Sequence, residues 1–135
     1  MTRFTPLFAL AGLVAAAPLA ANAPAPIAGR WQSPSDSVVV EVAPCGSAFC
    51  GTVVSATAKA KADARKGGTA SLVGTRLMTG FKPIGGGKYR GKVLLPKRGM
   101  HATGTIRLAG RNTLVVEGCA LAGIICKEQR WDRVG

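Results

Sequence analysis

The sequence is poor in the side chains that carry most enzyme and metal chemistry. Its 135 residues include one His, six Asp and Glu together, and seven aromatic residues. Outside the N-terminus, no apolar run approaches the ~20 residues that a membrane-spanning helix needs, which excludes a multi-span membrane protein. A hydrophobic fraction of 47% excludes a disordered chain. The length suits one domain of ordinary size.

The few candidate catalytic residues form no recognisable site. His101 has no nucleophile motif beside it, and Gly-x-Ser-x-Gly is absent from the chain. The three glycines at 85–87 precede neither Lys-Ser/Thr nor a predicted helix, so they are not a phosphate-binding loop. We expect the carboxylates at the surface, among them Glu41, Glu117, Glu128 and Asp132. The sequence therefore predicts a protein that is not an enzyme, with no catalytic residues, no cofactor and no metal.

The N-terminus has the pattern of a secretory signal peptide. Arg3 precedes an apolar stretch at 7–17, and the Ala-Asn-Ala at 21–23 fits the small-x-small cleavage rule. We predict a signal peptide at 1–23 and one domain at 24–135, in a protein that is periplasmic or secreted. An uncleaved anchor is the alternative, although the apolar stretch is shorter than the ~20 residues of a spanning helix.

The four cysteines are expected to form two disulfides. An even number of cysteines in an exported chain favours disulfides, and four of them allow three pairings. Local pairing of Cys45 with Cys50 and of Cys119 with Cys126 is favoured, since each pair brackets a predicted hairpin turn. A zinc site is the alternative, but these spacings are wider than those of a Cys-x-x-Cys knuckle.

Short β-type segments alternate with turn residues along the rest of the chain. Val38, Val40 and Val42 share one face of such a segment, and the Ala/Lys/Gly-rich stretch at 58–71 is expected to be a surface loop with at most one helical turn. The pattern predicts an all-β fold, a single small antiparallel up-and-down barrel of about eight strands with two local disulfides. The predicted strands are 27–32, 37–43, 49–57, 72–78, 88–95, 101–108, 113–119 and 126–134.

Three residues suggest how the barrel closes. Trp31 lies in the first predicted strand, and Trp131 and Arg133 lie in the last, which is its neighbour in an up-and-down barrel. An indole stacked on a guanidinium there would contribute ~0.5–2 kcal/mol. The arrangement resembles the Gly-x-Trp and late Arg of lipocalin-type barrels. Separate burial of the two Trp residues is the alternative.

The chain also resembles a bacterial family of unknown function, the domain-of-unknown-function 2147 family. The matching pieces are Gly-Arg-Trp at 29–31, the Cys-containing block at 44–51, Leu-Val-Gly at 72–74, Gly-Phe at 80–81, Gly-Cys at 118–119, Cys126, and Gln-Arg-Trp-Asp-Arg-Val at 129–134. The resemblance implies an exported bacterial protein of unsettled function on a small β-rich fold. It supplies no catalytic residues. The basic stretch at 59–66 departs from the family's Asp/Asn/Pro-rich pattern.

Charge is the remaining signal. Lys and Arg number 18 against six acids, which gives a formal net charge of +12. Lys88, Arg90 and Lys92 alternate along one predicted strand and so share a face, and Lys97 with Arg98 follows in the next turn. These five residues are candidates for binding an anion through salt-sensitive attraction. A merely solvated basic surface is the alternative.

Two function classes follow. The first is an exported, non-enzymatic envelope protein that binds an anionic or amphiphilic ligand, such as anionic lipid, lipopolysaccharide or a cell-wall polymer, and not nucleic acid. The second is a protein-interaction barrel, such as an inhibitor of an exported hydrolase, for which a protruding disulfide loop with an exposed Phe49 or Leu121 would be evidence. The sequence predicts neither the physiological role nor the oligomeric state.

Overall fold

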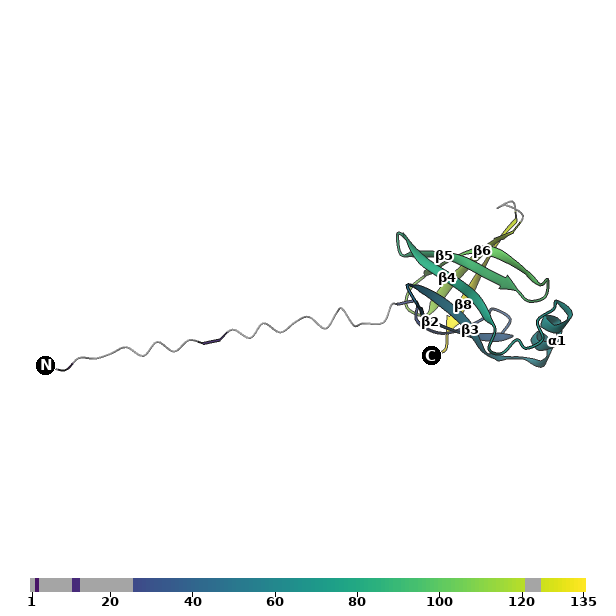
Figure 1. Ribbon diagram of the computed structural model, residues 1–135, viewed down its shortest axis with the longest axis horizontal. Helices are drawn as coiled ribbons and strands as arrows, with labels where there is room; N and C mark the ends of the chain where they lie inside the picture. The colour runs from purple at the N-terminus through teal and green to yellow at the C-terminus, as the bar shows by residue number, and fades with distance from the viewer. Residues whose placement is uncertain (1, 3–10, 13–25, 121–124) are drawn as a thin grey trace.

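The computed structural model describes residues 2, 11–12, 26–120 and 125–135, and its described strands form a closed antiparallel barrel (Figure 1). Each strand pairs with the next along the chain, and the last pairs with the first. The predicted eight-stranded up-and-down barrel is confirmed. Its strands are β1 (Gly29–Gln32), β2 (Val38–Cys45), β3 (Ala48–Ala56), β4 (Arg76–Gly85), β5 (Lys88–Leu95), β6 (Met100–Leu108), β7 (Thr113–Ala120) and β8 (Ile125–Arg133).

Alternating residues of each strand build the core. Val38, Val40 and Val42 of β2 are buried, whereas Val39 and Glu41 between them are only partly so. Successive side chains of a strand point to opposite faces, so the valines fill the interior while the intervening residues face outward. The predicted signal peptide falls almost wholly outside the described residues and stays a prediction.

The seam between β1 and β8 closes the barrel around Trp31. This indole is fully buried, donates from Nε1 to the carbonyl of Ile27 at 3.0 Å, and lies 4.2 Å from the guanidinium carbon of Arg133. Arg133 also donates to the carbonyl oxygens of Pro26 and Ala28 at 2.7 and 3.0 Å. The strand partner of Trp31 in β8 is Arg133 itself, so the stack follows from the register. Trp131 is also buried, at a different place in the interior.

The expectation of a loop at 58–71 is wrong, because helix α1 occupies Ala58–Lys66. Thr57 caps it by accepting a hydrogen bond at Oγ1 from the amide of Ala60, at 3.2 Å. Ala64 is buried and Ala60 half-buried, so these two small side chains, four residues apart, turn one helix face to the barrel. α1 sits at one end of the barrel, and the C-terminus lies toward the other (Figure 1).

The fourth strand also differs from expectation. It begins at Arg76 rather than at 72, and it continues through Gly80, which was expected to end it. The register with β5 shifts between Thr79 and Lys82, and Gly80 adopts a φ of 67°. Glycine tolerates this left-handed backbone, so the strand bends through an irregularity instead of stopping.

Both predicted disulfides are present, Cys45–Cys50 and Cys119–Cys126. The first spans the turn between β2 and β3, and the second joins directly opposed residues of β7 and β8. They therefore lie at opposite ends of the barrel. Among the described residues, no helix is long and apolar enough to cross a membrane.

Candidate functional site

A row of three glycines crosses the interior of the barrel. Gly91 of β5 pairs with Gly104 of β6, and Gly104 pairs with Gly118 of β7. The space beside the first two is taken: a Cβ on Gly91 would lie 2.7 Å from Cδ2 of Phe81, and one on Gly104 would lie 2.4 Å from Cγ2 of Val93. A Cβ on Gly118 would meet nothing within 4 Å. The interior is thus filled beside Gly91 and Gly104 and open beside Gly118, at the end of the row.

The open space beside Gly118 is a cavity of about 600 Å³. Its wall is mostly apolar and comes from the strands around it and from the segment that follows α1. Ala60 of α1 also contributes, so the helix forms part of the edge of the cavity. The apolar wall residues are Val38, Leu72, Leu77, Met78, Val93, Leu94, Leu95, Ala102, Val116 and Trp131.

The cavity opens at the end of the barrel that carries α1, which we call the mouth. Its polar lining comes from the β1–β2 turn, the β5–β6 turn and the start of β8. The serines of the β1–β2 turn are engaged within it, since Ser33 Oγ accepts from the amides of Ser37 and Val38 at 3.1 Å. The cations of the lining are Lys97, Arg98 and Lys127, and no described lining residue is acidic. Gln129 accepts at Oε1 from Nε1 of Trp131, at 3.1 Å, which orients both side chains in the wall.

Contacts between α1 and the β5–β6 turn hold one side of the mouth. Asp63 of α1 lies 3.6 Å from Nζ of Lys97 and 2.8 Å from Nζ of Lys59. The hydrogen bond from Lys59, together with the positive charge of Lys97, holds the pKa of Asp63 below its ordinary value. Directly after the helix, Gly67 lies so close to Pro96 that a Cβ would stand 1.9 Å from its carbonyl oxygen. The helix end and the turn are therefore in close contact.

The structure separates the five predicted anion-binding candidates into two groups. Lys97 and Arg98 line the mouth. Lys88, Arg90 and Lys92 are exposed on the outer face of β5. The residues that alternate with them, Tyr89, Gly91 and Val93, face inward. Lys127 joins the mouth group and was missed, because an isolated Lys near a cysteine has no sequence signal until β8 is placed against the cavity.

Lys88 and Arg90 border a second, smaller groove of about 210 Å³ on the outer face. Glu117 of β7 and Glu128 of β8 also line this groove. The cations on the outer face of β5 therefore have acidic neighbours that the sequence of β5 alone does not show. The pairing of the four strands β5 to β8 brings these carboxylates beside Lys88 and Arg90, although they are far apart in the sequence. The groove is lined by Ile84, Lys88, Arg90, Thr105, Arg107, Val115, Glu117 and Glu128.

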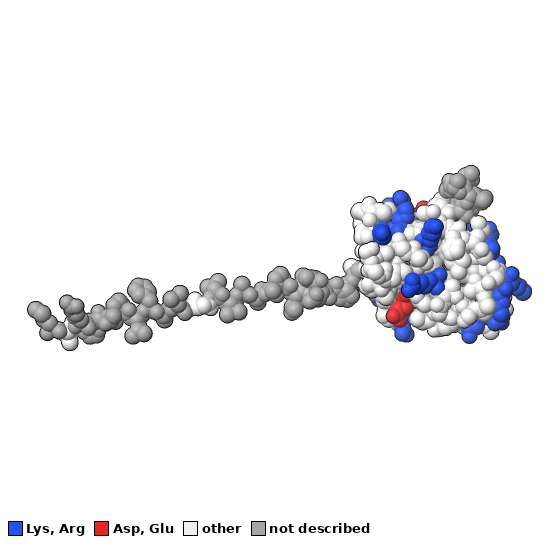
Figure 2. Space-filling model, in the orientation of Figure 1, with Lys and Arg blue, Asp and Glu red and all other residues white. Residues whose placement is uncertain are grey.

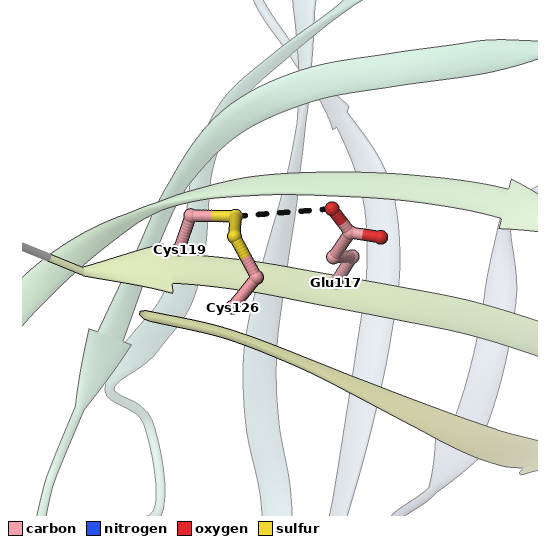
Figure 3. Close-up of side chains that lie close together, drawn as sticks. All are labelled: Glu117, Cys119 and Cys126. Carbon is pink, nitrogen blue, oxygen red and sulfur yellow. Dashed lines mark hydrogen bonds between the residues drawn. A yellow bond between two sulfur atoms is a disulfide. The ribbon is translucent and has the colours of Figure 1, made fainter. Parts of the chain in front are cut away.

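One cluster of potential metal ligands lies beside this groove (Figure 3). Donor atoms of Glu117, Cys119 and Cys126 lie within 4.8 Å of one another, with Oε1 of Glu117 at 3.8 Å from Sγ of Cys119. The two sulfur atoms are joined to each other. A disulfide sulfur is neither a thiolate ligand nor a proton donor, so this is a contact beside a disulfide and not the zinc site considered as an alternative.

His101 and Phe49 take positions without an evident chemical role. His101 is exposed at the start of β6. Phe49 is half-buried near the turn of the first disulfide, with its ring edge-on to Tyr89 at 5.7 Å between centroids. Leu121, the other residue considered for a protruding loop, lies outside the described residues.

Comparison with known proteins gives a family and a fold. The family described as "Uncharacterized protein conserved in bacteria (DUF2147)" matches residues 29–133. A similar solved structure is described as "Protein HP1028 from the human pathogen Helicobacter pylori belongs to the lipocalin family". It superposes with a TM-score of 0.62 at 15% sequence identity, over 81% of this chain and 83% of that one. Among curated proteins, none matches the chain.

Proposed function

The chain belongs to the bacterial DUF2147 family, and on that premise we propose that it is an exported, non-enzymatic barrel that binds an anionic amphiphile. The observation that carries the proposal is the cavity itself. Its walls are apolar, three cations stand at its mouth, and its described lining contains no acid. The lipocalin-like fold supports a binding role in general terms.

The two parts of the cavity suit the two parts of an amphiphile. A hydrocarbon chain gains about 0.8 kcal/mol for each CH₂ group that leaves water for the apolar walls. An anionic head group would then lie beside Lys97, Arg98 and Lys127. The volume of about 600 Å³ falls in the range of small-molecule sites, roughly 300–1,000 Å³. A lipid-sized ligand fits this description, whereas a cell-wall polymer could contact only the outside.

Export is supported by the disulfides and by the N-terminal pattern. Disulfides persist in oxidising compartments such as the bacterial periplasm, and the chain has two. The proposed mature protein begins at Pro24 and has no free thiol. Intact-mass measurement of exported material, with and without reductant, tests both points, and an N-terminus at Met1 would contradict the proposed cleavage.

The cavity is best tested at Gly118, where a side chain would enter open space. We would titrate laurate, a single-chain anionic amphiphile, into the wild type and into Gly118→Ala, Gly118→Leu and Gly118→Phe by calorimetry. Affinity should fall as the added side chain grows. Gly118→Phe should lose about tenfold, which corresponds to about two CH₂ groups displaced from the walls. Equal affinity across the series, in variants that melt like the wild type, would contradict binding in the cavity.

The contribution of the mouth cations to binding is tested by comparing ligands whose head groups carry opposite charges. Lys97→Gln with Arg98→Gln should weaken laurate binding by roughly fivefold, since exposed ion pairs contribute modestly. The same variant should bind dodecyltrimethylammonium, which has an equal chain and the opposite charge, no more weakly than the wild type. Lys88→Gln with Lys92→Gln is the matched control. A larger loss of laurate binding in that control would place the anion site on the outer face of β5.

The alternative of a protein-interaction barrel has less support among the described residues. A protruding disulfide loop with an exposed Phe49 or Leu121 would favour it. Phe49 is half-buried against Tyr89, and Leu121 lies outside the described residues. The amphiphile-binding proposal is therefore favoured.

A further inference from the structure

The mouth end of the barrel is surrounded by positive charge. α1 contributes four exposed cations, and the cavity lining contributes three more. Asp36 in the β1–β2 turn and Asp63, which is already paired with Lys59 and Lys97, lie at this end, and Glu117 and Glu128 flank the Cys119–Cys126 bridge there. In the space-filling view, blue side chains lie along the right-hand edge, where α1 lies, and others are spread over the left part of the visible face (Figure 2). The seven cations are Lys59, Lys61, Arg65, Lys66, Lys97, Arg98 and Lys127.

Two exposed apolar side chains lie at the same end. Val73, in the segment between α1 and β4, is 40% exposed, and Met100, at the start of β6, is 36% exposed. Each comes directly after a part of the mouth in the chain. Val73 follows Leu72, which lines the cavity, and Met100 follows the β5–β6 turn. Cations around exposed apolar side chains are the combination that interfacial membrane-binding surfaces use.

The opposite end of the barrel also carries exposed apolar side chains, since Ile84 of β4 is 45% exposed and Val134 is 50% exposed, but the described cavity opens at the mouth. Arg30 there is paired with Glu41 at 3.2 Å, and Arg133 is engaged by Trp31 and by carbonyl oxygens. Arg30 and Arg133 thus serve the closure of the barrel, although Lys82, Lys88 and Arg111 are also exposed at or near this end. At the mouth, five of the seven cations have no ion-pair partner among the described residues. The cavity that opens among the mouth cations, more than their number, therefore distinguishes the two ends.

We propose that the mouth end docks on a bilayer that contains anionic phospholipid, with the cavity facing the lipid. This rests on the proposed function and deepens it, because it makes the bilayer the source or destination of the amphiphile. The cations of α1 and of the β5–β6 turn contact the head groups, and Val73 and Met100 enter the interfacial layer. The ligand then passes between bilayer and cavity without crossing open water.

The first test is flotation of the ligand-free protein with vesicles of phosphatidylcholine, with and without phosphatidylglycerol. Binding should require phosphatidylglycerol and should weaken as salt shortens the screening length from about 8 Å at physiological strength to about 3 Å at 1 M. Absence of binding to phosphatidylglycerol vesicles at low salt would overturn the proposal.

A matched pair of triple variants tests the orientation. Lys61→Gln/Arg65→Gln/Lys66→Gln removes three positive charges from the mouth end, and Lys88→Gln/Arg90→Gln/Lys92→Gln removes three from the outer face of β5. Each cation near an anionic surface is worth roughly fivefold in affinity, so the first variant should lose about a hundredfold. The second should lose no more than about threefold. Equal losses would mean that net charge alone drives binding, and a greater loss in the second would move the docking surface to the outer face.

The Gly118→Phe variant separates this proposal from the proposed function. Its cavity is filled but its mouth cations are unchanged, so it should float with phosphatidylglycerol vesicles as the wild type does. Wild type that binds laurate but not vesicles overturns docking alone. Wild type that binds vesicles but not laurate overturns the cavity proposal and leaves the docking surface in place.

Discussion

Gly104 and Gly118 are partners on neighbouring strands, yet they lie on opposite sides of the boundary that divides the interior. At Gly104 the ring of Phe81 and a methyl group of Val93 take the space that a side chain would need. At Gly118 that space is open and belongs to the cavity. One glycine permits close packing, and the other leaves a void. Glycine in these two paired positions therefore allows close packing beside Gly104 and leaves the cavity open beside Gly118.

This division extends to the two ends of the barrel. The end opposite the mouth, which we call the closed end, is held by the Trp31–Arg133 stack, by carbonyl hydrogen bonds and by the Phe49–Tyr89 contact. The mouth end is formed by loops and a helix, with cations around an apolar hollow. The contacts that close the barrel thus lie at one end, and the cavity opens at the other.

The largest expected effect is at the closed end. Trp31→Ala should lower the free energy of unfolding by roughly 3–5 kcal/mol, because it removes a fully buried indole. Trp131→Ala should cost less, since the space it leaves joins an existing cavity. Urea unfolding of both variants measures the difference. A wild-type unfolding midpoint for Trp31→Ala would refute this expectation.

The two disulfides should have similar effects on stability and different effects on binding. Each closes a short loop and should contribute about 2–2.5 kcal/mol in the chain-entropy model. Replacing Cys119 and Cys126 by Ala should also weaken laurate binding, because Gly118 and Lys127 adjoin that bridge. Replacing Cys45 and Cys50 by Ala should not. Calorimetric titration of the two double variants is the measurement, and equal binding losses would contradict the division between the ends.

The glycine pair itself offers the sharpest comparison on stability. Gly104→Ala should cost about 1–3 kcal/mol through overpacking against Val93 and Phe81. Gly118→Ala should instead be neutral or stabilise by about 0.5 kcal/mol, because it reduces the freedom of the unfolded chain. Thermal or urea unfolding of the two variants distinguishes them, and the idea fails if both are destabilised alike.

The smallest effect concerns the contact between α1 and the β5–β6 turn. The pKa of Asp63 is lowered from its ordinary value of 3.8, first by the hydrogen bond from Lys59. Its stabilising effect is therefore present above pH 3.8 and is lost as the pH falls through the lowered pKa of the folded state. The melting temperatures of the wild type and Asp63→Asn should differ slightly near neutral pH and converge below that range. A difference that persists in acid would point to a cause other than charge.

Local patterns were sufficient to predict the barrel, most of its strands and both disulfides. Alternating valines and short cysteine spacings act within one element or one hairpin, so the sequence displays them directly. α1 was missed because its Ala/Lys composition obscured the Thr57 cap and the inward pair of Ala60 and Ala64. The cavity could not be predicted, because it depends on what occupies the space beside Gly118 after three strands are paired.

The central claim is that the ligand enters the empty half of the interior and leaves the filled half undisturbed. Amide chemical shifts recorded during a laurate titration test it most directly. The account predicts the largest changes at Val38, Val116 and Gly118, which border the cavity, and little change at Tyr89 and Gly91. Largest changes at Lys88, Arg90 and Lys92 instead, with the cavity residues unmoved, would contradict it.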